Sequence, residues 1–432
     1  MRRVRVGAIG GLDPSGGAGV EMDVKVGSAI GVHVHPIATM VTYQTSSTYF
    51  GGRCLDIESV IHQIKTVRGV EIWKTGALCS NEIAEVVLET VKGKLVVDPV
   101  MEASAGGKLF QGTTRDMLNI VSRSFATTPN VIEAQKLLNM KIKDINDMIR
   151  AAKEIQSMGP KLVVLTGGHM NELVDVIVYE DKVEVIRGRF RGESAHGSGT
   201  VLASALASYL AKGLDPIKAA RIAVGFTRLL HTFKVKIDEG YVLDPFVQMR
   251  YMAIKSEMYE EYYAFLQWLR FLKPEEAKRI APEVGINVAY SVPAEFSRGK
   301  GSILAVPGRI HLTPTGLKPC SYPWWGASDH MARLLLEAQK FNPSIRAAMN
   351  VKYSEDNVKK LMDAGYLVVE VKREEQPRGV KSMEWSVRKA VEIAGKLPDV
   401  IYDKGFYGKE AMIRLLATDL PSLRKMVESI IK

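Results

Sequence analysis

The sequence predicts an α/β protein, in which a first domain built on a mainly parallel sheet is followed by a second, smaller α/β domain. Short apolar runs that suit buried strands alternate with helical patterns in the first half of the chain, which is the order expected of a parallel sheet. The small-residue run 201–211 follows a glycine-rich turn and indicates a buried helix. At 432 residues the chain exceeds what one hydrophobic core usually serves. Two domains are therefore expected.

The elements of the first domain begin with a strand over residues 4–9. A glycine-dense loop, 10–19, leads from it into a helix that Gly31 ends. A further strand is expected over 33–41, followed by a polar turn over 42–48. These elements form the first strand–helix–strand unit of the predicted sheet.

Polar residues follow the next strands at their carboxyl ends. The apolar run 94–101 contains an acid before Pro99, which stops strand pairing. A helix opens within 127–134, and the strand 161–165 runs into a threonine. Because ligands gather beyond the carboxyl ends of parallel strands, we expect these side chains to lie together. They are Asp13, Asp98, Asn130, Glu133 and Thr166, joined by the turn that carries His196.

The turn 195–200 is the stretch around which the first domain is expected to be organised. Gly197 and Gly199 allow a tight turn and leave amide groups unshielded at the start of a helix, where anions bind. An ordinary tight turn into a helix fits the same residues. Gly213 is placed to end this helix, and Asp215 to cap the next one. No P-loop and no dinucleotide-binding motif is present.

Composition limits the classes of partner and compartment. The net charge of +10 comes from scattered Lys and Arg without a recognisable nucleic-acid module, so phosphorylated small molecules are preferred to nucleic acid as partners. No apolar run reaches the length of a membrane span, and no signal peptide precedes the first strand, which favours the cytoplasm. Cys54, Cys79 and Cys320 are far apart and are expected to be reduced and structural. A homo-oligomer is compatible with these features.

The domain boundary is expected near residue 255, which gives domains over 1–254 and 255–432. A helix over 256–272 should begin the second domain and end before Pro274. A strand over 285–292 follows, with helices over 329–339 and 355–364 further on. These elements suffice for a second core.

The first domain resembles the hydroxymethylpyrimidine kinase and hydroxymethylpyrimidine phosphate kinase branch of the ribokinase family. The order and spacing of several motifs carry this resemblance, although each alone is weak. They are the run Gly11-Leu12-Asp13-Pro14-Ser15-Gly16-Gly17-Ala18-Gly19, Asp23, Gln44, Asp98-Pro99-Val100-Met101, Thr128-Pro129-Asn130 with Glu133, Gly167-Gly168-His169, and His196-Gly197-Ser198-Gly199.

The resemblance implies a three-layer αβα fold that transfers the γ-phosphate of ATP to a pyrimidine. Gln44 would hydrogen-bond the polar edge of the pyrimidine, and a plain turn residue is the alternative for it. Gly11 and Val100 would line the pocket. Asp13 and Asp23 are further substrate candidates.

The resemblance also assigns a nucleotide side to this site. Asn130 and Glu133 would hold Mg²⁺ and its waters near the ATP phosphates, with Asp98 as a second metal candidate. A helix N-cap with a first-turn acid explains the same pair without a metal. Thr166 and Gly168 are expected beside ATP.

Two positions depart from the family pattern. Thr200 stands where the family usually has cysteine and ribokinase relatives often have an aspartate base, and Ala77 replaces a methionine of the pyrimidine pocket, which would enlarge it. A threonine hydroxyl cannot act as a base near neutral pH. A phosphate monoester, with a second pKa of about 6, needs no base. We therefore expect the anion-binding backbone at Gly197, Ser198, Gly199 and Thr200 to support phosphate kinase activity, with weak alcohol kinase activity.

The second domain resembles the archaeal-type thiamine-phosphate synthase domain, which is commonly fused behind such a kinase. The matching stretches are 282–290, 308–310, 326–333, 346–350, 373–377, 399–403 and 405–410. The resemblance implies condensation of hydroxymethylpyrimidine diphosphate with a thiazole phosphate, releasing pyrophosphate. Arg309 and His330 are the implied catalytic residues, and either could instead be a solvated surface charge. Ser328, Asn350, Arg373 and Lys409 are candidate phosphate-binding residues.

The sequence thus predicts a bifunctional thiamine-biosynthesis enzyme that uses ATP and Mg²⁺. One alternative is a kinase fused to a non-catalytic domain that senses thiamine phosphate, since similar domains occur behind DNA-binding modules. Another is a kinase of a different small alcohol, such as pyridoxal. Arg309 and His330 argue against the sensor, and Gln44 with the 11–19 loop argues against the pyridoxal kinase.

Overall fold

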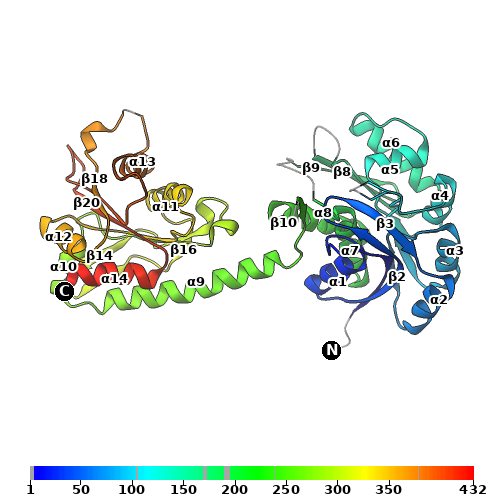
Figure 1. The fold of residues 1–432 in the computed structure, drawn as a ribbon, viewed down its shortest axis with the longest axis horizontal. Helices are drawn as coiled ribbons and strands as arrows, with labels where there is room; N and C mark the ends of the chain where they lie inside the picture. The colour runs from blue at the N-terminus through cyan, green and yellow to red at the C-terminus, as the bar shows by residue number, and fades with distance from the viewer. Residues whose placement is uncertain (1–3, 104–105, 169–172, 189–194, 238, 378) are drawn as a thin grey trace. The chain divides into compact units, whose positions relative to one another are not determined.

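The chain separates into two compact units, Met1–Met249 and Arg250–Lys432, shown in the computed structural model (Figure 1). The structure describes residues 4–103, 106–168, 173–188, 195–237, 239–377 and 379–432. The boundary expected after residue 254 falls inside one continuous helix, α9 (Val247–Arg270).

The first unit is built on a nine-stranded sheet with the order β3-β2-β1-β4-β5-β6-β7-β8-β9. The strands from β2 to β7 in this order are parallel, whereas β3, β8 and β9 pair in antiparallel fashion at the two edges. The strands are β1 (Arg5–Leu12), β2 (His33–Gln44), β3 (Tyr49–Cys54), β4 (Ile72–Thr75), β5 (Lys94–Val97), β6 (Ala126–Thr127), β7 (Leu162–Thr166), β8 (Leu173–Tyr179) and β9 (Lys182–Gly188).

Helices cover both faces of this sheet, so the expected three layers are present (Figure 1). One face packs against α2 (Ile57–Thr66), α3 (Asn81–Thr90), α4 (Thr114–Ser122), α5 (Val131–Leu138) and α6 (Ile145–Ser157). The other packs against α1 (Gly19–Ile30) and α7 (Ser198–Ala211), with α8 (Pro216–Thr232) beside α7. A small antiparallel pair, β10 (Val235–Ile237) and β11 (Gly240–Val242), follows α8.

The helix after the glycine-rich turn forms as predicted. Gly197 stands at its N-cap with a φ of 81°, and a Cβ there would lie 1.8 Å from the Gly17 carbonyl oxygen, so only glycine fits. Asp215 caps the next helix through the amides of Ile217 and Lys218. Both chain reversals therefore rest on local residues.

The polar turn expected over 42–48 was wrong in its first half. β2 continues to Gln44 because its last residues pair with the edge strand β3, and only Thr45 to Thr48 form the reversal, closed by a 2.9 Å hydrogen bond from the Thr45 amide to the Thr48 carbonyl. Pairing with an edge strand overrides the local preference of the polar residues here.

The second unit is a seven-stranded sheet with the order β16-β13-β12-β17-β20-β19-β18, antiparallel except for the pair β18 and β19. The strands are β12 (Val288–Ser291), β13 (Ile303–Ala305), β16 (Trp324–Trp325), β17 (Ala347–Lys352), β18 (Val368–Glu370), β19 (Val400–Asp403) and β20 (Met412–Ala417). A hairpin of β14 (Ile310–Thr313) and β15 (Gly316–Pro319) stands apart from this sheet.

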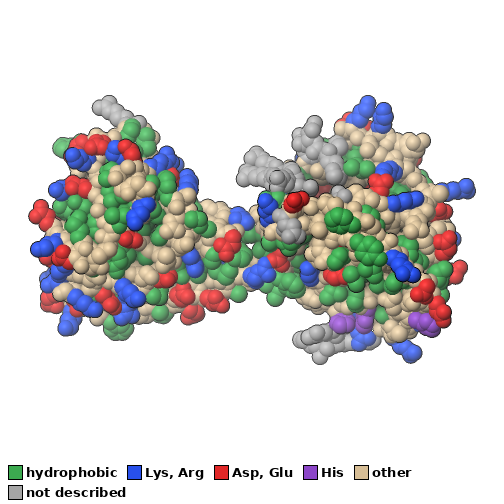
Figure 2. Space-filling view, viewed as in Figure 1, with side chains coloured by type: hydrophobic (Ala, Val, Ile, Leu, Met, Phe, Trp, Pro, Cys, Tyr) green, Lys and Arg blue, Asp and Glu red, His purple; other side chains and the backbone are tan. Residues whose placement is uncertain are grey.

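Two hydrophobic cores lie on the two faces of the second sheet. One core joins it to α9, α10 (Pro274–Ile280), α12 (Glu355–Asp363) and α14 (Leu420–Ile431), and the other joins it to α11 (Asp329–Phe341) and α13 (Ser382–Ala394). Basic and acidic side chains are intermingled over the visible surface of each unit, as the scattered charge of the sequence indicated (Figure 2). Across the described ranges, no helix has the length and apolar character needed to cross a membrane.

Candidate active sites

The carboxyl ends of β1, β5, β6 and β7 lie at one edge of the first sheet, because these strands are parallel and separated only by β4. Asp13 follows β1 and Asp98 follows β5. Asn130 and Thr166 form an isolated bridge at the ends of β6 and β7. The expected gathering of polar residues at one edge is therefore present.

Asp13 organises the loop that follows β1. Its carboxylate accepts hydrogen bonds from the amides of Ser15 (2.9 Å) and Ala18 (2.8 Å), from the Ser15 hydroxyl (2.9 Å), and from His196 Nε2 (2.9 Å). Burial would raise the pKa of Asp13, but hydrogen bonds led by those from His196 and Gln44 outweigh it and hold the pKa below its ordinary value. The hydrogen bonds of the Asp13 carboxylate are thus made within the protein, and they join the β1 loop to the turn before α7.

The pyrimidine pocket expected from the sequence has Gly11 at its base. A Cβ on Gly11 would lie 3.0 Å from Met40 Cγ and 3.7 Å from Ala77 Cβ, so Gly11 packs closely against these neighbours and a side chain there would crowd Met40. Gln44 lies beside Asp13, and its Oε1 is buried without a hydrogen-bond partner. An unsatisfied buried acceptor fits a ligand that brings an N–H group. Val100, just beyond β5, is partly exposed.

The N-terminus of α7 faces Asp98. A Cβ on Gly199 would lie 3.5 Å from Asp98 Oδ2, and Gly199 is exposed, so its amide is open to a ligand. No side chain caps the helix. The Ser198 hydroxyl instead donates to the Ala195 carbonyl (2.7 Å) and lies 3.0 Å from His231 Nε2. Free amides at the start of a 14-residue helix form an anion-binding site.

Asp98 and Glu133 are two acids that disturb one another. Burial raises the pKa of Asp98 to about 6, and burial followed by the charge of Asp98 raises the pKa of Glu133 to about 8. Glu133 also forms a capping box with Asn130, in which each side chain binds the other's amide at 2.9 Å. The helix-cap role foreseen for this pair is present. A divalent cation would relieve the repulsion between the carboxylates.

Asp23 does not lie in the position expected of a substrate contact. It is 1% exposed, and its carboxylate pairs with Lys74 Nζ at 2.9 Å and accepts a hydrogen bond from the Ser204 hydroxyl. Burial of Lys74 requires a counter-ion, and Asp23 supplies it from α1. Gly168 is exposed with open space where a Cβ would be, which suits close approach of a ligand, whereas His169 lies outside the described residues.

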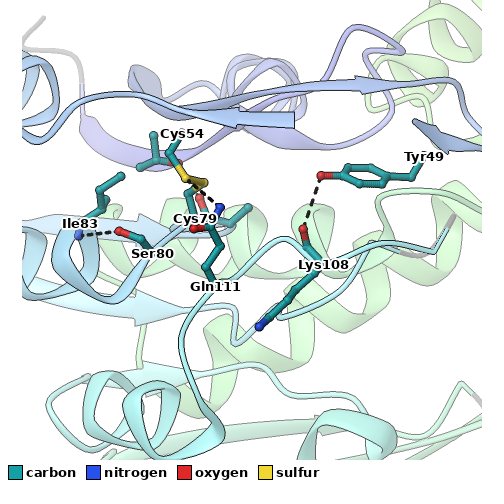
Figure 3. The surroundings of a disulfide bond; sticks show 9 residues. Tyr49, Cys54, Cys79, Ser80, Ile83, Lys108 and Gln111 are labelled. Atoms are coloured by element: carbon teal, nitrogen blue, oxygen red, sulfur yellow. Dashed lines mark hydrogen bonds between the residues drawn. A yellow bond between two sulfur atoms is a disulfide. The ribbon is translucent and has the colours of Figure 1, made fainter. Parts of the chain in front are cut away.

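The prediction that the cysteines are reduced was wrong for two of them. Cys54, which ends β3, and Cys79, beyond β4, form a disulfide with a Cα–Cα distance of 5.7 Å, and exposed Cys320 is free (Figure 3). The Gln111 amide donates to the Cys79 carbonyl (2.7 Å), and its side chain reaches Cys54 Sγ (3.6 Å). The cysteines are 25 residues apart, so only the folding of segment 76–79 toward β2 and β3 brings them together.

Arg309 and His330 both belong to the second unit, and the charge of Arg309 acts on His330. Arg309 has a φ of 74°, unusual for a residue other than glycine, and its guanidinium donates to the Val284 carbonyl at 2.7 Å. Burial lowers the pKa of His330, and the charges of Arg333 and Arg309 lower it further. These cations suit a negatively charged substrate. Ser328 caps α11 through the Met331 amide, as foreseen.

The remaining phosphate-binding candidates differ in their surroundings. Asn350 and Arg373 are both 8% exposed, whereas Lys409 is exposed in a turn that it closes with Phe406. The sequence analysis missed Arg414 of β20, which is 3% exposed. A signal was present, because this arginine interrupts a run of apolar residues in a strand that is buried throughout.

Comparisons with known proteins match both units. A family model described as phosphomethylpyrimidine kinase matches residues 13–243, and one described as thiamine-phosphate synthase ThiN matches residues 267–429. The bifunctional thiamine biosynthesis protein ThiDN of Methanocaldococcus jannaschii is 32% identical over 433 residues, which cover 98% of each chain. A hydroxymethylpyrimidine/phosphomethylpyrimidine kinase of Streptomyces coelicolor is 34% identical over 225 residues, which cover 50% of this chain and 84% of that protein.

Among solved structures, the pyridoxal kinase of Staphylococcus aureus in complex with ADP has a TM-score of 0.52 at 26% identity, covering 57% of this chain and 94% of that one. This likeness agrees with the ribokinase-like architecture of the first unit. The kinase model and the ThiN model together span most of the sequence in the same order as the two units. The chain therefore belongs to the bifunctional family in which a phosphomethylpyrimidine kinase precedes a thiamine-phosphate synthase of the ThiN type.

Proposed function

We propose that the first unit phosphorylates hydroxymethylpyrimidine phosphate with ATP, and that the second condenses the resulting diphosphate with thiazole phosphate to form thiamine phosphate and pyrophosphate. The observation that carries the kinase assignment is the uncapped N-terminus of α7, whose Gly199 lies near Asp98 at the carboxyl edge of the sheet. The match to both family models supports the pairing of the two activities.

In the kinase step, the amides of Ser198, Gly199 and Thr200 would stabilise the phosphoryl group during transfer. Such transfer depends mainly on positioning and on stabilisation of charge. Gln44 Oε1 would accept a hydrogen bond from the amino group of the pyrimidine, which satisfies its buried lone pairs. Gly11 leaves room for the ring. The nucleotide would lie along Thr166 and Gly168.

Asp98 and Glu133 fit Mg²⁺, because this ion is usually bound by one or two carboxylates together with substrate phosphates. Burial and the charge of Asp98 raise the pKa of Glu133, and a bound cation would favour the charged form of its carboxylate. Bound Mg²⁺ would neutralise charge on the ATP phosphates. Asn130 holds the Glu133 carboxylate in place through the capping box.

Thr200 favours a phosphate over an alcohol as acceptor. A phosphate monoester is largely a dianion at pH 7, so its oxygen attacks without loss of a proton. An alcohol must lose a proton, and the threonine hydroxyl does not serve as its base. The aligned backbone of the anion site still acts on either acceptor.

In the synthase step, Arg309 would neutralise the charge that develops on the departing pyrophosphate. Burial and the charges of Arg333 and Arg309 lower the pKa of His330, which favours its neutral imidazole, and this would donate a hydrogen bond to a phosphate oxygen without adding charge. A cation aimed at a leaving group stabilises the transition state more than the substrate, which is how such a residue accelerates the reaction.

The experiment that tests both steps is a coupled assay with the full chain, ATP, Mg²⁺, hydroxymethylpyrimidine phosphate and thiazole phosphate. Thiamine phosphate and pyrophosphate are the expected products. A second arm supplies the diphosphate directly and omits ATP, so that synthase activity is measured alone. Tight binding of thiamine phosphate without its formation in either arm would contradict the synthase and support a sensor.

Pyridoxal is the second candidate substrate of the kinase, because the first unit is similar to pyridoxal kinases of known structure. The free acceptor at Gln44 and the lack of a base at Thr200 argue for the pyrimidine phosphate. Turnover of pyridoxal equal to that of hydroxymethylpyrimidine phosphate under the same conditions would contradict the preference for the pyrimidine phosphate.

A further inference from the structure

A band of buried polar residues crosses four neighbouring strands of the second sheet. Asn287 lies just before β12, Asn350 is in β17, Arg414 is in β20, and Asp403 ends β19. Strand pairing sets Asn350 opposite Arg414, and the Asn287 amide donates to Asn350 Oδ1 at 2.7 Å. Arg373 follows β18 and closes the band at the other end.

The three polar residues that stand in strands, Asn350, Arg414 and Asp403, point to the face that packs on α11 and α13. Each stands two positions from a residue of the apolar core on that face, and residues two apart in a strand share a face. The corresponding core residues are Ala348, Leu416 and Ile401. The apolar core thus gives way to a polar band at one end of the sheet.

The charges in this band do not balance. Asp403 is fully buried, and its Oδ2 lies 2.8 Å from Arg414 Nη1 and 3.1 Å from Arg373 Nε. Its other carboxylate oxygen accepts the Gly405 amide. Among the described residues, Asp403 is the only carboxylate that forms an ion pair with either arginine, so two cations share one anion.

An excess positive charge in a buried place is costly unless an anion joins it. Burial lowers the pKa of the Arg414 guanidinium, and the charge of Arg373 acts in the same direction. A guanidinium also remains charged in proteins under ordinary conditions, so the excess is not removed by loss of a proton. Arg414 Nη1 donates a hydrogen bond to Asp403, whereas Arg373 Nε lies 3.1 Å from the same carboxylate oxygen and is buried without a hydrogen-bond partner. Guanidinium N–H groups bind phosphate oxygens.

Contacts connect this band to Arg309. The Asn350 side chain donates to the Gly285 carbonyl at 3.0 Å, and Arg309 donates to the adjacent Val284 carbonyl at 2.7 Å. The Glu410 carboxylate accepts the amides of Glu283 and Val284 and so fixes the same segment. Asn350 of the band and Arg309, the candidate synthase residue, therefore both bind the segment 284–285.

We propose that Arg373 and Arg414, which Asp403 neutralises only in part, bind a phosphoryl group of a synthase substrate, with Arg414 as an essential member of this subsite. The inference rests on the proposed synthase function. The phosphoryl group comes either from the pyrimidine diphosphate or from the thiazole monophosphate, since both present the same chemistry to a pair of guanidinium groups.

The test measures binding of pyrophosphate and of inorganic phosphate to the full chain by calorimetry, with a saturating non-hydrolysable ATP analogue occupying the first unit. Arg414→Met should weaken binding of the anion at least tenfold. Arg388→Met is the control, because this exposed arginine of α13 pairs with Glu337 of α11 and has no ion pair with Asp403, and the variant should bind the anion as the unchanged chain does. Unchanged affinity in Arg414→Met would overturn the proposal.

Two further variants keep the result interpretable if Arg414→Met does not fold. Arg414→Lys retains the charge but loses the planar fork, and Arg373→Met leaves one arginine paired with Asp403. Each should weaken anion binding while the second unit remains folded, as followed by thermal unfolding. Anion affinity like that of the unchanged chain in both folded variants would contradict the subsite.

Steady-state synthase assays then identify the source of the phosphoryl group. A raised KM for the pyrimidine diphosphate alone assigns the subsite to the diphosphate, and a raised KM for thiazole phosphate alone assigns it to the monophosphate. If the unchanged chain forms no thiamine phosphate but Arg414→Met still loses pyrophosphate binding, the proposed function fails and the subsite stands. If synthesis is normal in Arg414→Met, the subsite fails and the function stands.

Discussion

Asp13 shows how a residue that resembles a ligand contact can serve the protein itself. Its carboxylate binds two amides, a hydroxyl and His196 at the same time. Sequence reasoning placed Asp13 at the correct sheet edge from its position after a strand. It could not show that the hydrogen-bonding capacity was already used, because His196 lies 183 residues away in the chain.

Asp13→Asn should lower the free energy of unfolding by about 2–3 kcal/mol at pH 7, because hydrogen bonds to a buried charge are lost. The folded pKa lies below the ordinary value of 3.8, so the stabilisation is fully present above that pH and disappears as the pH falls through the folded pKa. Urea unfolding at pH 7, 5 and 3 measures it. The difference from the unchanged chain should be equal at pH 7 and 5 and smaller at pH 3. A difference independent of pH would contradict a role for the charge.

Thr200 is the residue at which acceptor choice can be tested. Thr200→Cys supplies a group with an ordinary pKa of about 8.5 that is lowered at a helix N-terminus, so a fraction is thiolate near neutral pH. Alcohol kinase activity on hydroxymethylpyrimidine should rise at least about tenfold, whereas activity on its phosphate should change little. Thr200→Ser is the control, since it keeps a hydroxyl. In this variant the rate with the alcohol should stay low and the rate with the phosphate should stay high. Equal turnover of alcohol and phosphate by the unchanged chain would defeat the base argument.

At the scale of elements, the structure ties the edge of the first sheet to the pocket. The disulfide links Cys54 at the end of β3 to segment 76–79, whose Ala77 carbonyl also accepts a hydrogen bond from Thr39 of β2 at 2.6 Å. Ala77 lies next to Gly11, since a Cβ on Gly11 would be 3.7 Å from Ala77 Cβ. The disulfide therefore restrains a segment that lines the proposed pyrimidine pocket.

Cys54→Ser with Cys79→Ser should lower the free energy of unfolding of the first unit by about 3 kcal/mol, because the bond closes a loop of 25 residues in the unfolded chain. The KM for the pyrimidine substrate should rise more than kcat falls, since the pocket segment loses a restraint. Thiol titration of the denatured chain should find one free cysteine before reduction and three after it. Cys320→Ser is the control and should change neither stability nor KM. Three free thiols without reduction would contradict the bond.

Elements with strong local signals were predictable, whereas those fixed by distant partners were not. The helix after Gly197 and the capped helix after Asp215 formed at the expected places because turn and cap chemistry is local. The pairing of Cys54 with Cys79 and of Asp23 with Lys74 depends on strand order, which the sequence does not display. The band through Arg414 was missed because a single charge in an apolar strand has no local partner.

At the scale of the whole molecule, the proposed activities belong to separate compact units. Arg309→Ala and His330→Ala should each abolish formation of thiamine phosphate while phosphorylation of hydroxymethylpyrimidine phosphate stays within about twofold, since surface and site changes in one unit do not alter the other. The two arms of the coupled assay measure both rates. Loss of kinase activity in these variants would show that the units depend on one another.

The helix α9 decides where the second unit begins. The ThiN model starts at residue 267, inside this helix, but Met258, Tyr262, Phe265 and Leu266 precede that point and are buried in the core of the second sheet. Tyr262 is fully buried, and its hydroxyl donates to the Val288 carbonyl at 2.7 Å. Most of α9 is thus part of the synthase unit and not a linker.

A fragment of residues 250–432 should fold and retain synthase activity, whereas a fragment of 267–432 should be unfolded. Burial of four large apolar side chains contributes about 6–12 kcal/mol, as an upper estimate at about 1.5–3 kcal/mol each. This contribution is comparable to the whole free energy of unfolding of a domain, about 5–15 kcal/mol. Without it, the folded state of the shorter fragment is no longer favoured. Circular dichroism and thermal unfolding of both fragments measure the difference, and a fragment of 255–432, which keeps all four side chains, should behave like the longer one. A cooperative transition in 267–432 at the temperature found for 250–432 would show that α9 does not hold this core together.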